Sequence, residues 1–151
     1  MIVKMERIRI LYYASLGHVN RFSTFVRSIN ERLTDFKIDI QSLNIGGLIT
    51  NLTEDPNFDM VLVHLTSSEM RELNVLRTDY FGKKGLFGVI EHSRGIYDGL
   101  IVAESRDYPA SREEIVKIFD DYIQPVENEI YLSNFVGFLK RHHLIPQDFE
   151  L

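Results

Sequence analysis

The 151-residue chain contains no cysteine, which excludes disulfide bonds, a thiolate nucleophile and cysteine-ligated zinc or iron–sulfur sites. It also has no apolar run near the roughly 20 residues that span a bilayer, and no signal-peptide segment is expected after Met1. Walker, Gly-x-Ser-x-Gly and His-Glu-x-x-His motifs and internal repeats are absent. The net charge of −5 argues against nucleic-acid and membrane partners. We therefore expect a single cytoplasmic domain, residues 1–151, large enough for one hydrophobic core.

Short apolar stretches alternate with amphipathic ones along the chain. This alternation predicts strands separated by helices, and hence a parallel sheet covered on both faces. The five expected strands are residues 7–14, 36–43, 58–65, 85–90 and 126–132. Five such strands at this length indicate an α/β, flavodoxin-like, doubly wound sheet in the order 2-1-3-4-5.

The segments between the expected strands differ in pattern. Residues 44–57 are polar and are expected to form a loop, and a short helix is expected after Thr66. A capping-box pattern predicts a helix over 111–122, and Ser133 is expected to cap the last helix. The segment 97–107 fits either a helix or a short strand, and the sequence leaves both open.

Apolar periodicity also predicts the core. The first helix is expected to follow the strand 7–14 directly and to bury residues at helical spacing. The residues expected to be almost fully buried are Ile10, Phe22, Val26, Ile29, Val61, Val63, Val89 and Phe119.

The turn Ser15–Asn20 leads from the first expected strand into the first expected helix. The first N–H groups of a helix have no backbone partner, and the helix dipole favours an anion there. Gly17 has no Cβ, which permits close backbone approach and unusual φ values. We therefore predict an anion-binding loop here; the alternative is an ordinary βα turn without a ligand.

Three loops are expected to meet at the carboxyl edge of the sheet: residues 15–20, 64–69 and 91–97. Their hydroxyls, amides and backbone N–H groups suit a phosphate, and an aromatic residue suits a flat ring. The candidate cofactor-binding residues are Ser15, Leu16, Gly17, His18, Val19, Asn20, Thr66, Ser67, Ser68, His92, Ser93, Arg94, Gly95 and Tyr97. For each of them the alternative is a loop residue that faces water.

The histidines allow an enzymatic function as an alternative to a ligand-binding one. His18, His64 and His92 lie near the expected ends of three neighbouring strands. Imidazole is a common metal ligand and general base, so a three-histidine metal site or a histidine-based hydrolase is an alternative. His64 lies in an apolar stretch and is expected to be a hydrogen-bonded core residue, so we assign neither a metal site nor a catalytic residue.

Two segments resemble a known family. YYASLGHVNRF, residues 12–22, resembles the phosphate-binding loop of the NrdI family, the small flavodoxins that serve class Ib ribonucleotide reductase, with Gly17 and Phe22 in register. GVIEHSRGIYDG, residues 88–99, resembles the third loop of that family. The corresponding positions there are Gly88, Val89, Ile90 and Tyr97, with Arg94 and Gly95 approximately so.

The resemblance implies an electron-transfer or oxidant-generating flavoprotein that binds FMN without a covalent bond. Its partner would be the dimanganese small subunit of class Ib ribonucleotide reductase. The resemblance places the phosphate at Ser15, Gly17, His18 and Asn20, and the ring among Ser67, Ser68, Ser93, Arg94, Gly95 and Tyr97. The second hypothesis is a flavin-free flavodoxin-like module that binds a protein or another anionic ligand, because Leu16 and Val19 stand where the family has hydroxyls.

Overall fold

The computed structural model describes residues 6–32, 36–43, 48–66, 85–105, 118–123 and 129–150. Its strands are β1 (Glu6–Tyr13), β2 (Phe36–Leu43), β3 (Met60–His64), β4 (Leu100–Glu104) and β5 (Asp121–Ile123). Its helices are α1 (Leu16–Asn30), α2 (Leu48–Glu54), α4 (Gly85–Arg94) and α6 (Glu129–Arg141).

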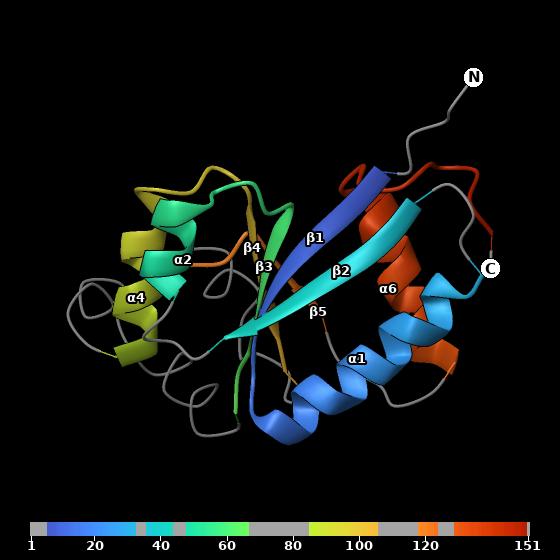
Figure 1. Ribbon diagram of the computed structural model, residues 1–151, viewed down its shortest axis with the longest axis horizontal. Coiled ribbons are helices and arrows are strands. Elements are labelled where there is room, and N and C mark those ends of the chain that lie inside the picture. The colour runs from blue at the N-terminus through green and yellow to red at the C-terminus, as the bar shows by residue number, and fades with distance from the viewer. Residues whose placement is uncertain are drawn as a thin grey trace.

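The five strands form one parallel sheet in the order β2-β1-β3-β4-β5. This order confirms the predicted fold class. Helices α1 and α6 lie on one face of the sheet, and α2 and α4 lie on the other (Figure 1). The strand order changes direction between β1 and β3, and in sheets of this kind ligands bind at the carboxyl ends of the strands beside such a point.

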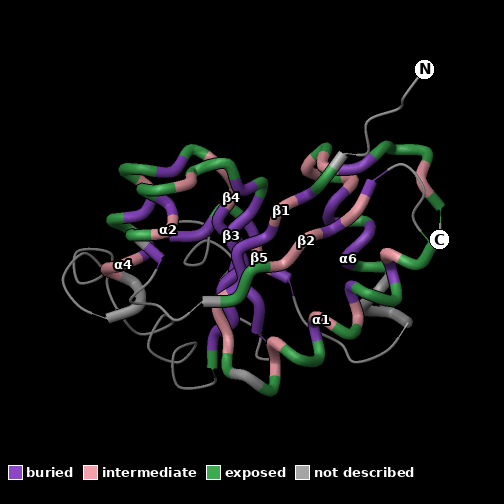
Figure 2. Tube along the Cα trace, viewed as in Figure 1, coloured by how far each residue is buried: buried purple, intermediate pink, exposed green. Residues whose placement is uncertain are grey.

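Two hydrophobic layers cover the sheet. On one face Ile8, Ile10 and Tyr12 of β1 pack against α1 and α6. On the other face Leu11 packs with apolar residues of α2 and α4. Strand β3 lies in the middle and is buried along its whole length, whereas the outer faces of the helices are exposed (Figure 2).

The predicted core is largely correct. Ile10, Phe22, Val26, Ile29, Val61, Val63 and Phe119 are buried, with at most 4% of their surface exposed. Val89 is the exception, because it is only partly buried. Helix α1 follows the expected spacing: Phe22, Val26 and Ile29 lie on its inner face.

The prediction of the fourth strand at residues 85–90 is wrong, because this segment begins α4. A short apolar run does not distinguish a buried strand from a buried helix, and here Ile90 packs from the helix onto the second hydrophobic layer. The fourth strand is Leu100–Glu104, so the strand alternative for residues 97–107 is the correct one. The predicted loop 44–57 is also partly wrong, since it contains α2.

The prediction of the fifth strand at residues 126–132 is wrong in the same way. Residues 129–132 are the first turn of α6, which therefore begins before Ser133. The fifth strand is Asp121–Ile123, at the end of the predicted helix 111–122. Pairing with β4 outweighs the helical spacing of this stretch. The helix expected after Thr66 and most of the helix expected over 111–122 lie outside the described residues.

Candidate functional site

Three strands place polar side chains at the carboxyl edge of the sheet. Tyr12 lies near the end of β1, and His64 and Glu104 are the last residues of β3 and β4. All three are buried, and Glu104 exposes only 2% of its surface. The Tyr12 hydroxyl donates a hydrogen bond to Glu104 Oε1 over 2.5 Å, and His64 Nδ1 lies 3.0 Å from the same oxygen. The buried carboxyl group of Glu104 thus accepts from Tyr12 and lies in hydrogen-bond contact with His64.

Tyr12 is held in its protonated form by this arrangement. Burial and the neighbouring carboxylate of Glu104 raise the pKa of Tyr12 far above its ordinary value. Its ring also stacks on Phe22, with 4.6 Å between the ring centroids. Tyr12 therefore acts as a permanent hydrogen-bond donor to Glu104 near neutral pH.

Two further side chains connect this buried group to the surface. The His18 ring packs against the His64 ring in a tilted arrangement, with 3.9 Å between their centroids and 32° between their planes. Ser15 Oγ lies 2.7 Å from His18 Nδ1. We call Tyr12, Ser15, His18, His64 and Glu104 the carboxyl-edge cluster. It leads from exposed Ser15 to fully enclosed Glu104.

The first predicted loop is mostly helical. Ser15 is the N-cap of α1, and Leu16 to Asn20 form the first turns of the helix. Ser15, Gly17 and Asn20 are exposed, whereas His18 and Val19 are partly buried. Gly17 has no left-handed φ, so the expectation of an unusual backbone conformation there is wrong. Thr66 is exposed at the same edge, and Ser67 and Ser68 lie outside the described residues.

The third predicted loop lies at the opposite edge of the sheet. Residues 85–94 form a helix, so the loop after them leads into the amino end of β4 (Figure 1). The expectation that this loop meets residues 15–20 is therefore wrong. The candidate residues that the structure separates from Ser15–Asn20 in this way are His92, Ser93, Arg94, Gly95 and Tyr97. Because His92 lies there too, His18, His64 and His92 do not converge as a three-histidine site.

Arg94 and Tyr97 fix the amino edge. Arg94 Nε donates to the Ile118 carbonyl over 2.6 Å, and Arg94 forms an ion pair with Asp120 at 3.1 Å. The buried Tyr97 hydroxyl donates to the Phe58 carbonyl over 2.8 Å, and burial raises the pKa of Tyr97. These contacts tie α4 and the loop after it to the segments that precede β3 and β5.

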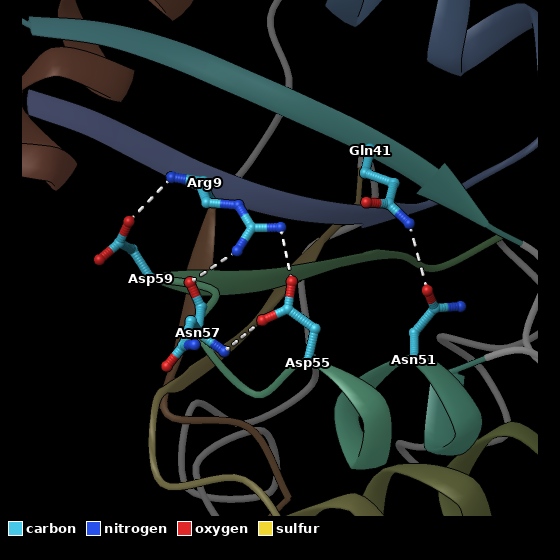
Figure 3. A network of polar contacts seen from close by, with 6 residues as sticks. All are labelled: Arg9, Gln41, Asn51, Asp55, Asn57 and Asp59. Atoms are coloured by element: carbon cyan, nitrogen blue, oxygen red, sulfur yellow. Dashed lines mark hydrogen bonds and ion pairs between the residues drawn. The ribbon is translucent and has the colours of Figure 1, made fainter.

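Arg9 joins β1 to the connection between α2 and β3 (Figure 3). Its guanidinium pairs with Asp55 at 2.8 Å, donates to the Asn57 carbonyl over 3.3 Å, and lies 4.3 Å from the centre of the Phe58 ring. The hydrogen bond with Asp55 raises the pKa of Arg9 and lowers the pKa of Asp55. This network ties β1 to the segment that precedes β3.

Two aspartates repeat one backbone contact at the amino edge. Asp59, just before β3, accepts a hydrogen bond from the Arg9 amide and donates its own amide to the Arg9 carbonyl, each over 2.8 Å. Asp120, just before β5, makes the same pair of bonds with Ile101, over 2.8 and 2.7 Å. Each aspartate thus extends the pairing of two neighbouring strands by one residue.

Sequence reasoning found Ser15, His18 and His64 but missed Tyr12 and Glu104. The available signal was an acidic residue at the end of the apolar run LIVAE, which is costly to bury without partners. In the part of the chain that the structure describes, no three histidine, aspartate or glutamate side chains are grouped to hold a metal ion. None of the helices described there has the length and apolarity needed to cross a membrane.

No protein-family model and no curated protein matches this chain. Solved structures with the same flavodoxin-type α/β fold include CheY-like receiver domains. One is from the complex of the P1 domain of CheA3 with CheY6 from R. sphaeroides, with a TM-score of 0.54 and 14% identity over 90% of this chain and 98% of that chain.

Two further structures show the same fold. A CheY-like response regulator receiver domain from Methylobacillus flagellatus has a TM-score of 0.53 and 13% identity, covering 90% of this chain and 99% of that one. A chain from the complex of histidine kinase ThkA with response regulator TrrA has a TM-score of 0.52 and 16% identity, covering 87% and 97%. At these identities the similarity defines the fold alone.

Proposed function

We propose that this chain is a flavin-free flavodoxin-like module that binds a protein partner. The observation that carries the proposal is the separation of the predicted loops. Ser15–Asn20 lies at the carboxyl edge of the sheet, whereas Arg94 and Tyr97 lie at the amino edge. Residues on opposite edges of a sheet do not enclose one flavin ring.

The centre of the carboxyl edge supports the same conclusion. Tyr12, Glu104 and His64 fill the ends of β1, β4 and β3 with a buried, hydrogen-bonded group. A flat apolar ring placed there would displace the hydrogen-bond partners of Glu104. Leaving a buried carboxyl group without partners costs free energy. The site is therefore better suited to contact at its surface than to an inserted ring.

Helix α1 is the surface that we assign to the partner. Its outer face is polar and exposed, and the helix contains Arg21 and Arg27 but no acidic residue, in a chain of net charge −5. Such a face favours a protein with an acidic surface. Two proteins of similar fold, CheY6 and TrrA, occur in complexes with the P1 domain of CheA3 and with ThkA, respectively.

We place the module in the cytoplasm.

FMN binding in the manner of the NrdI family is the second candidate. It is favoured by exposed Ser15, Gly17 and Asn20 at the start of α1, where backbone N–H groups face an incoming anion. In that case the reductase small subunit would be the partner, and the ring would need surroundings other than Arg94 and Tyr97.

The first test measures flavin directly. The purified protein should show no flavin absorption, and titration of the protein with FMN up to millimolar concentration should give no saturable quenching of flavin fluorescence. Tight binding of FMN in a 1:1 ratio would contradict the proposal and favour the second candidate.

The second test asks which face contacts a partner. A photo-cross-linking amino acid replaces Thr24 in one variant and Thr53 in the other, and both are produced in the source cells. These exposed threonines lie on α1 and α2, on opposite faces of the sheet, and form a matched pair. We expect one discrete cross-linked protein from position 24 and none from position 53. Equal cross-linking from both positions, or none from either, would contradict the assignment of α1.

A further inference from the structure

Ser15 and His18 form a pair that the proposed function does not use. Ser15 occupies the N-cap position of α1, with φ of −65° and ψ of 158°, yet its side chain makes no capping hydrogen bond. Serine at this position usually accepts from the amides of the first turn. Here the hydroxyl instead lies 2.7 Å from His18 Nδ1. An exposed hydroxyl is thus held against an imidazole.

The imidazole of His18 is oriented by a second ring. The centroid of the His18 ring lies 3.9 Å from that of the His64 ring, and His64 exposes only 6% of its surface. His64 is anchored in turn by Glu104, over 3.0 Å. A nucleophile, a base in hydrogen-bond contact with it, and a group that orients the base together form the signature of an activated nucleophile.

Ser15 lies on an open part of the surface at the start of α1. Ser15 and Gly17 are exposed, and a Cβ added at Gly17 would meet nothing within 4 Å. The amides of the first helical turn have no partner within the helix, so they can donate to an oxyanion that forms on a group attached to Ser15. These amides support the pair but would not define a site without it.

We propose that Ser15 and His18 form an acyl-transfer site for small carboxylic esters. In neutral His18 with its proton on Nε2, Nδ1 accepts the hydrogen bond from Ser15. The Ser15 oxygen attacks the ester carbonyl while Nδ1 takes the hydroxyl proton. The tetrahedral intermediate then collapses, the bond to the leaving alcohol breaks, and the alcohol takes that proton. In the second half, His18 takes a proton from a water molecule while the water oxygen attacks the acyl carbonyl. The bond between the acyl group and Ser15 then breaks, Ser15 takes the proton from His18, and the carboxylic acid leaves.

This activity does not depend on the protein-binding function, because it uses residues within the chain. His18 contacts Ser15 on its own helix and His64 on β3, and His64 in turn contacts Glu104 on β4.

The test uses a fluorophosphonate probe and p-nitrophenyl acetate. When the probe reacts, a bond from Ser15 Oγ to phosphorus forms, the phosphorus–fluorine bond breaks, and fluoride leaves. Peptide mapping by mass spectrometry locates the label. The variants are Ser15→Ala and His18→Gln, and the control is Ser28→Ala, which removes another exposed serine of α1. Circular dichroism checks that all variants are folded.

We expect the label on Ser15 in the wild type and in Ser28→Ala. His18→Gln should slow labelling about 100-fold, since general-base catalysis contributes a factor of roughly that size or more. Ser15→Ala should lose the label and at least about nine-tenths of the ester hydrolysis. Absence of the label from Ser15 would overturn the proposal. A wild-type hydrolysis rate in Ser15→Ala would also overturn it, because the imidazole alone would then be reacting with the ester.

Discussion

Replacing Tyr12 by Phe isolates one hydrogen bond of the carboxyl-edge cluster. The ring stays stacked on Phe22, but Glu104 loses the donor that lies 2.5 Å from Oε1. A hydrogen bond to a charged group contributes about 1.5–3 kcal/mol, and Glu104 exposes only 2% of its surface to the solvent that would replace the lost donor. We therefore expect Tyr12→Phe to lower the free energy of unfolding by about 1.5–3 kcal/mol.

Urea unfolding followed by circular dichroism measures this loss. The control is Tyr122→Phe, because the Tyr122 hydroxyl donates over 2.8 Å to a neutral acceptor, the Ser105 carbonyl. The control should lose only about 0.5–1.5 kcal/mol. A loss at Tyr12 that is no larger than the loss at Tyr122 would show that Glu104 is not a charged, enclosed acceptor.

The same variant has a distinct pH dependence. Burial raises the pKa of Tyr12 and of Tyr97 in the folded state, whereas in the unfolded chain a tyrosine titrates near pH 10. The stabilisation is therefore complete below about pH 10 and is lost as the pH rises above it. Each such tyrosine contributes a slope of about 1.4 kcal/mol per pH unit. Above about pH 10, Tyr12→Phe should reduce the fall of the unfolding free energy with pH by the contribution of one tyrosine. An unchanged slope would refute the reasoning.

Three further predictions concern packing, charge and backbone. Val61→Ala should lower the free energy of unfolding by about 1–3 kcal/mol, and Val89→Ala by clearly less because Val89 is only partly buried; denaturant titration of both variants checks this. Burial would raise the pKa of Asp121, but its hydrogen bonds, the largest of them with His142, lower that pKa in the folded protein. The stabilisation that Asp121 gives the folded state is therefore present above about pH 4 and is lost at lower pH. His142→Ala should weaken this acid dependence in unfolding measured from pH 3 to 7. Gly17→Ala should raise stability by about 0.5–1 kcal/mol in thermal unfolding, because Gly17 is helical and the added Cβ meets no atom.

The fold class could be predicted because it depends on alternation, which is local in sequence. Strand β2 matches the predicted range 36–43, β1 is shifted by one residue from the predicted 7–14, and β3 is shorter than the predicted 58–65 by two residues at its start and one at its end. The runs GLFGVI and LIVAE are both short and apolar, and only their partners decide that the first belongs to α4 and the second to β4.

The candidate site could be predicted only in part, for a related reason. Ser15 and His18 are three positions apart, so the turn that joins them is visible in the sequence. Tyr12 and Glu104 are 92 positions apart, and no local pattern shows that their side chains meet. The fourth strand is Leu100–Glu104 rather than the predicted 85–90. The loop that contains Arg94 therefore precedes this strand and lies at the amino edge, instead of following it at the carboxyl edge, so Arg94 is not part of the predicted site.

The contacts of Asp59 and Asp120 have a consequence for how this chain can vary. Each aspartate is bonded through both its side chain and its amide to one residue of the adjacent strand, Arg9 or Ile101. An inserted or deleted residue between the aspartate and its strand would turn the next side chains to the wrong face of the sheet. The connections into β3 and β5 are therefore fixed in length where they join the sheet. Insertions that keep the sheet intact therefore have to lie away from these two junctions.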